Sequence, residues 1–166
     1  MEVKDNFLDD AHLIQLDELI NNNTYFPWYL QEEQVDGADD GCFLLHKIYS
    51  DAATQSDFYV PLIDIFKNYL EYVSLCRIYA NLLIKQGLPK ASGFHTDFED
   101  THDKITTAIF YLNTNNGATE FENGDRIDCI RNRLLMFPAN SMVSLALSPK
   151  PSIASIVPSP KSLCAT

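Results

Sequence analysis

The sequence has no apolar run long enough to cross a membrane, and Met1 to Asp5 show neither the basic nor the apolar region of a signal peptide. We therefore expect a cytoplasmic protein without a membrane partner. Cysteine pairs are also missing, since the four cysteines are far apart in sequence and form no Cys-x-x-Cys motif. This spacing favours reduced thiols over disulfides or a thiolate zinc site at Cys42, Cys76, Cys129 and Cys164.

Positive charge is scarce. Lys and Arg number 12 against 23 Asp and Glu, which gives a formal net charge of -11. Such a surface repels phosphate backbones, so we do not expect a nucleic-acid partner. Hydrophobic residues make up 46% of the 166 positions, which is typical of one globular domain with a core of its own.

Two segments in the first half of the chain have helical periodicity. Asp9 to Asn22 repeats leucine and isoleucine at helical spacing, with Asp9 or Asp10 as the N-cap. Tyr59 to Val73 carries a broader apolar stripe and has Pro61 in its first turn. We expect these two helices to brace one face of a sheet.

The remaining pattern is that of short strands joined by Gly and Asn turns, which indicates an all-β sandwich or barrel. An edge strand or extended arm is expected at Tyr25–Leu30 and a strand at Cys42–Tyr49. The later strands are expected at Arg77–Ile84, Ile105–Asn113, Ala118–Phe121, Ile127–Ile130 and Arg133–Phe137. Tyr79 and Asn81 share one face of their strand, so they can present polar groups inside a barrel.

The chain changes character after residue 140. Ser141 to Thr166 has no acidic residue, aromatic residue or glycine, and it contains four prolines. Since proline cannot donate to a ladder, no central strand is expected beyond Met142 to Leu147. We divide the chain into a single domain at 1–140, with a helical part at 1–74 and a β core at 75–140, and an atypical tail at 141–166.

The candidate site is the His95-x-Asp97 motif, which precedes the strongest strand pattern. Residues i and i+2 of an extended segment point to the same face, so the imidazole and the carboxylate can converge. They supply two members of the 2-His-1-carboxylate triad that holds non-haem Fe(II).

The segments around this motif resemble the 2-oxoglutarate/Fe(II)-dependent oxygenase superfamily, in particular its prolyl-4-hydroxylase-like members. The resemblance rests on the ordered set Gly93–Asp97, Thr107–Asn113, Gly117–Phe121 and Asn132–Pro138. It implies a mainly β fold with N-terminal helices (α+β), a double-stranded β-helix or jelly roll of the cupin-like kind, with C-terminal strands that are incomplete.

The resemblance also implies cofactors and roles. His95 and Asp97 are the expected catalytic residues and metal ligands for Fe(II), with 2-oxoglutarate and O2 as cosubstrates. Tyr79 and Asn81 match, by position, the early-strand contacts of 2-oxoglutarate, although a core tyrosine with a satisfied hydroxyl explains Tyr79 equally well.

The resemblance fails downstream. The family pattern requires a distal histidine and then a basic anchor for the cosubstrate, but this chain has no histidine after His102 and no arginine after Arg133. Its only later cations, Lys150 and Lys161, each adjoin proline.

Three explanations stay open. In the first explanation, the C-terminal part of the chain is translated out of frame. A shifted reading frame across Ser141 and Met142 permits His followed by Gly, and the nucleotide sequence of the gene decides this. Alternatively, His102, His46 or Glu120 replaces the distal ligand. In the third, the oxygenase fold is degenerate and is kept for binding.

We therefore expect a dioxygenase or hydroxylase of undefined substrate, a small molecule or a peptide, impaired by the missing third ligand. Whether the chain is an enzyme stays open. The rival is a non-catalytic, cupin-like binding or interaction module. The sequence does not determine the oligomeric state.

Overall fold

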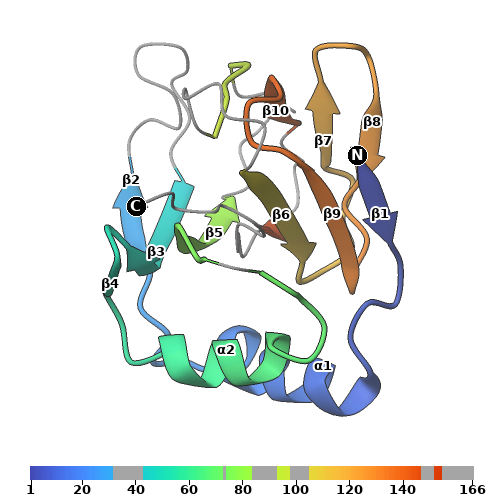
Figure 1. Cartoon of the computed structure of the whole chain (residues 1–166). Coiled ribbons are helices and arrows are strands. Elements are labelled where there is room, and N and C mark those ends of the chain that lie inside the picture. The colour runs from blue at the N-terminus through green and yellow to red at the C-terminus, as the bar shows by residue number, and fades with distance from the viewer. Residues whose placement is uncertain (32–42, 73, 84–92, 98–104, 147–151, 155–166) are drawn as a thin grey trace.

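The computed structural model describes residues 1–31, 43–72, 74–83, 93–97, 105–146 and 152–154. Within these residues, two short helical segments lie below two β-sheets (Figure 1). Cys42, the first residue of the expected strand Cys42–Tyr49, falls outside the described residues, as does His102.

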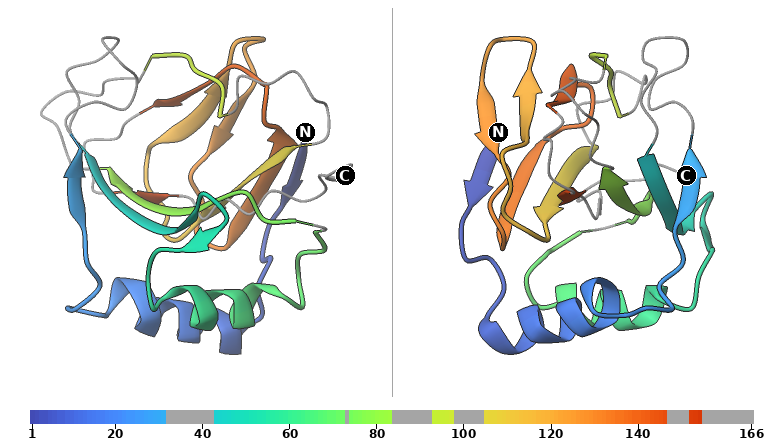
Figure 2. Two further views of the ribbon diagram at one scale, coloured as in Figure 1. Left: turned by 60° about the vertical axis from the view of Figure 1, so that its left-hand side comes forward. Right: turned by 180° about the vertical axis from the view of Figure 1, so that it is seen from behind.

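The first helix, α1 (Asp10–Leu16), continues directly into a π-helical turn, η1 (Asp17–Asn21). Asp9 caps α1, because its carboxylate accepts from the backbone N–H of His12 at 2.8 Å. The second helix, α2 (Tyr59–Phe66), packs beside α1 (Figure 2). The positions of both helices agree with the sequence prediction, although α2 is shorter than the predicted helix.

The larger sheet has eight strands in the order β1-β9-β6-β11-β5-β3-β2, with β4 paired to β3. Its strands are β1 (Glu2–Lys4), β2 (Tyr29–Gln31), β3 (Phe43–Ser50), β4 (Ala53–Thr54), β5 (Ile78–Leu83), β6 (Thr106–Tyr111), β9 (Arg133–Pro138) and β11 (Ser152–Ala154). The smaller sheet has the order β10-β7-β8, from β7 (Ala118–Phe121), β8 (Arg126–Asp128) and β10 (Val143–Ala146). All pairings are antiparallel.

The two faces of the larger sheet bury different cores. On the helix face, Ala80, Phe110 and Leu134 pack with residues of α1 and α2. On the inner face, Ile109 and Phe137 pack with Phe121 of the smaller sheet. Because side chains alternate along a strand, Tyr79 and Asn81 lie on the inner face, opposite in direction to Ile78 and Ala80. The layers are therefore helices, larger sheet and smaller sheet, the arrangement of a double-stranded β-helix braced by helices.

One sequence prediction about the tail is wrong. Ser152–Ala154 forms β11 and lies in the middle of the larger sheet, between β5 and β6. This three-residue strand contains no proline; Pro151 and Pro158 lie outside it, so they do not interrupt its ladder. The prediction missed this strand because it used the proline content of the whole tail and not that of the three residues themselves.

The second helix also ends earlier than its apolar stripe. The backbone N–H of Tyr69 donates to Phe66 O at 2.9 Å, a tight turn beyond α2, while Leu70 remains buried. Periodicity reports burial of side chains, so it extended the helix past its last α-helical residue. None of the helices among the described residues has the length and apolarity to span a bilayer.

Candidate metal and cosubstrate site

The His95–Asp97 segment is held by backbone pairing at the end of the barrel far from the helices (Figure 1). His95 forms an antiparallel bridge with Val143: His95 N donates to Val143 O at 2.9 Å, and Val143 N donates to His95 O at 2.8 Å. Asp97 N donates to Ala139 O at 3.1 Å. These bonds tie the segment to β10 and to the residue after β9.

Both carboxylate oxygens of Asp97 have partners. Oδ1 accepts from the guanidinium of Arg77, which forms an ion pair with it, and Oδ2 accepts from Thr107 Oγ1 at 2.6 Å. Arg77 directly precedes β5, and Thr107 lies fully buried on β6. Since Thr107 alternates with the helix-face residue Ala108, the Asp97 carboxylate lies on the inner face of the larger sheet.

His95 presents one ring nitrogen to its own segment. Its Nδ1 lies 3.1 Å from the carbonyl oxygen of Gly93. A carbonyl only accepts, so this hydrogen bond places the proton on Nδ1 and leaves the lone pair on Nε2. A hydrogen bond of this kind orients a histidine that binds metal through its other nitrogen.

A line of polar residues follows the inner face near Asp97. Tyr79 lies opposite Lys47 of β3 in the ladder, and Asn81 lies opposite Leu45. The Tyr79 ring contacts two cations, with the Arg77 guanidinium carbon 5.4 Å and Lys47 Nζ 5.9 Å from its centroid. The two residues expected at a cosubstrate subsite therefore share the face on which Asp97 lies, beside two positive charges.

Two of the three alternative third ligands, His46 and Glu120, lie elsewhere, and the third, His102, falls outside the described residues. His46, 2% exposed, points to the helix face between the rings of Phe26 and Phe58, at centroid distances of 4.6 and 5.6 Å. Burial lowers the His46 pKa, so the ring is neutral at pH 7. Glu120 lies between the inward-facing residues Thr119 and Phe121 and forms an ion pair with Arg126, so its side chain points away from the inner face.

These residues do not fit a complete iron site. Within the described ranges, no three His, Cys, Asp or Glu side chains are grouped to hold a metal ion. His95 offers its Nε2, and each oxygen of Asp97 already accepts one hydrogen bond, from Arg77 or from Thr107, which leaves one lone pair on each oxygen. A triad needs three donors, so the described residues do not complete an iron site.

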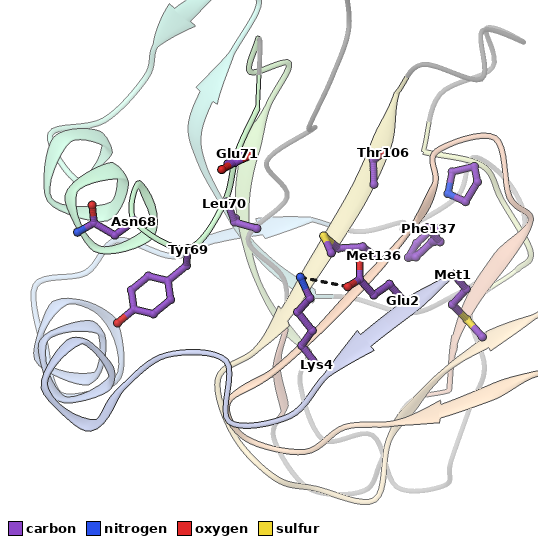
Figure 3. Close-up of a pocket in the computed structure, with 11 residues that line it drawn as sticks. Met1, Glu2, Lys4, Asn68, Tyr69, Leu70, Glu71, Thr106, Met136 and Phe137 are labelled. Carbon is purple, nitrogen blue, oxygen red and sulfur yellow. Dashed lines mark ion pairs between the residues drawn. The ribbon is translucent and has the colours of Figure 1, made fainter.

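The pocket of about 560 Å³ in Figure 3 lies away from this segment. It opens on the helix face, between the residues that follow α2 and the edge formed by β1, β9 and β6. Its lining includes Glu2, Lys4, Glu71 and Met136, with an ion pair between Lys4 and Glu2. Neither His95 nor Asp97 lines it, so it is not the site that the motif predicts.

Comparison with solved structures gives the same fold. A prolyl hydroxylase from Trichoplax adhaerens, in complex with a hypoxia inducible factor oxygen degradation domain peptide fragment, aligns over 96% of this chain and 83% of its own, with 16% identity and a TM-score of 0.68. A prolyl-4-hydroxylase from Pseudomonas putida aligns over 98% and 92%, with 11% identity and a TM-score of 0.60. The epimerase SnoN, in complex with Fe3+, alpha ketoglutarate and nogalamycin RO, aligns over 96% and 78%, with 13% identity and a TM-score of 0.67.

No family model and no curated protein matches the sequence. At these identities the structural likeness shows the fold, and it confirms the predicted double-stranded β-helix with N-terminal helices.

Sequence reasoning missed three residues around the site. Arg77 shares the alternation of Tyr79 and Asn81, which was the available signal that it faces inward. Thr107 and Lys47 gave no such signal, because their relation to Asp97 and Tyr79 depends on strand pairing across the sheet.

Proposed function

We propose that this chain has the framework of a 2-oxoglutarate- and Fe(II)-dependent dioxygenase of the hydroxylase kind, with an iron site that is impaired. The observation that carries the proposal is the bridge between His95 and Val143, which holds the His-x-Asp motif on the rim of the barrel. The free Nε2 of His95 and the inward carboxylate of Asp97 are the two donors. No third donor is grouped with them among the residues that the structure describes, so we expect weak metal binding and little or no turnover.

The cosubstrate subsite would use this chain's early strands. Tyr79 supplies a hydroxyl, and Lys47 and Arg77 supply positive charge near it. An ammonium or guanidinium makes stronger hydrogen bonds to a carboxylate than a neutral donor does. We therefore assign Lys47 the part of the basic anchor that the late strands lack, while Arg77, already paired with Asp97, adds positive charge beside it.

A second candidate is a non-catalytic module that binds a small carboxylic acid without metal. It is favoured by the contacts of Asp97, whose two oxygens are satisfied by Arg77 and Thr107. Such a module keeps the cations beside Tyr79 and needs no iron. The two candidates predict different metal requirements for the same ligand.

One experiment separates them. Succinate formation from 2-oxoglutarate is measured with Fe(II), ascorbate and O2, for the wild type and for His95→Ala, and thermal shifts by 2-oxoglutarate are measured with Mn(II) or with chelator. Succinate above the His95→Ala background, or protection that requires Mn(II), supports the impaired dioxygenase. Protection that persists in chelator supports the module. No protection under either condition contradicts both.

A further inference from the structure

We propose that Arg77 is the resident cation of the His95–Asp97 site, where its ion pair with Asp97 takes the place of a metal ion. We call Asp97 with its two side-chain partners, Arg77 and Thr107, the metal-free clasp. The guanidinium supplies at Asp97 the positive charge that a metal ion would otherwise bring. The disagreement between this site and a metal triad then has a structural cause within the chain.

The contacts of Asp97 are those of a structural carboxylate. One oxygen accepts from a charged donor and the other accepts from the Thr107 hydroxyl at 2.6 Å. The side chains of Arg77 and Asp97 are 22% and 16% exposed, against 46% and 34% for the ion pair of Arg126 with Glu120. Partial burial reduces screening by water and salt, so the attraction between the two charges is stronger in the inner pair than in the surface pair.

The clasp joins elements that are not paired directly. Arg77 precedes β5 and Thr107 lies on β6, and these two strands are separated in the sheet by β11. Asp97, in the connection between them, contacts both and also donates its backbone N–H to Ala139 after β9. Asp97 thus links three segments at the end of the barrel away from the helices, two through its carboxylate and one through its backbone.

The position of Arg77 is itself fixed. Its guanidinium lies over the ring of Tyr79, two residues further along the chain, at 5.4 Å from the centroid. This cation–π contact leaves the planar group directed at Asp97. A divalent metal at Asp97 must therefore either displace the guanidinium or bind beside a like charge, and both lower its affinity.

The inference rests on the proposed function only in naming metal as the competitor, because the ion pair itself requires no cosubstrate. The clasp is tested first without metal. Urea unfolding in chelator is measured for Arg77→Met, Asp97→Asn and the double variant. We expect the double variant to lose little more stability than either single variant, with a coupling of about tenfold or more in the unfolding constant. Independent, additive losses would overturn the clasp.

The competition is tested by titrating the full chain with Mn(II), using electron paramagnetic resonance to measure the free ion. Arg77→Met should lower the Mn(II) dissociation constant about tenfold or more relative to the wild type. Arg126→Met, which removes an arginine from an exposed ion pair, should leave it unchanged. Equal binding by the wild type and Arg77→Met, including no binding by either, overturns the competition.

The two proposals fail separately. Additive losses in the chelator experiment would remove the clasp and leave the succinate and 2-oxoglutarate results intact. Full turnover by the wild type would disprove an impaired dioxygenase and leave the metal-free coupling between Arg77 and Asp97 as measured.

Discussion

Lys47 and Tyr79 are direct partners across the β3–β5 ladder, and Lys47 Nζ lies 5.9 Å from the centroid of the Tyr79 ring. This pairing brings a cation from the first half of the chain to the face on which Asp97 lies. The family resemblance requires a basic anchor on a late strand, whereas Lys47 belongs to an early one.

The first prediction concerns this cation. Lys47→Met keeps the length of the side chain and removes its charge, so it should weaken 2-oxoglutarate binding by about tenfold or more. The dissociation constant is obtained from thermal shift against ligand concentration. Lys67→Met is the matched control, because Lys67 is exposed and pairs with Asp64 just beyond the end of α2. An unchanged constant in Lys47→Met would remove Lys47 from the subsite.

A second prediction tests the connection between the N-terminal segment and β9. The Asn132 amide accepts from Leu8 N at 2.8 Å and donates to Leu8 O at 2.9 Å, in a buried position. Asn132 also has a φ of 64°, which an alanine tolerates poorly. Asn132→Ala should therefore lower the free energy of unfolding by about 2–4 kcal/mol, measured in urea.

Asn132→Gly separates the two causes. Glycine adopts positive φ without strain but loses the same hydrogen bonds, so it should cost about 1 kcal/mol less than alanine. If both variants are as stable as the wild type, the amide does not anchor Leu8.

The third prediction concerns pH and His46. Burial lowers the pKa of this histidine in the folded protein, while the unfolded chain titrates near its usual value of 6.5. The folded state therefore resists protonation. The contribution of His46 to stability is present above pH 6.5 and is lost as the pH falls through the lowered pKa.

We expect His46→Phe, which suits the aromatic contacts with Phe26 and Phe58, to flatten the decline in stability below pH 6.5. Urea midpoints between pH 7 and pH 5 measure this slope. His12→Gln is the matched control, because glutamine keeps a polar side chain beside Asp9 and Tyr69, whose hydrogen bonds with His12 a phenylalanine would lose. An identical slope in the wild type and His46→Phe would contradict the assignment.

The regular elements followed from local patterns. β6 is buried along nearly its whole length and half of β9 is buried, and Asp9 caps α1 as its position indicated. The strands that the sequence analysis did not predict are short or exposed. β1 pairs only with β9 and is exposed along its length, so its three residues carry no alternation of burial to detect. β11 was not predicted because the prolines around it argued against a strand in this part of the chain.

At the candidate site, too, local sequence identified some residues and missed others. A spacing of two positions from His95 to Asp97 is enough to identify a motif, and alternation is enough to place Tyr79 and Asn81 on one face. The partners of Asp97 are 20 and 10 residues away, on β5's approach and on β6. Local sequence carries no information about which distant side chain reaches a carboxylate.

By itself, the sequence indicated a mainly β fold with N-terminal helices and the positions of most of its strands, and it singled out His95 and Asp97, because each of these depends on periodicity or on neighbours along the chain. Only the tertiary structure decided that Arg77 and Thr107 satisfy Asp97, that His46 faces the helices and that Lys47 lies opposite Tyr79. Those relations depend on strand order and register, which bring together residues that the chain keeps far apart.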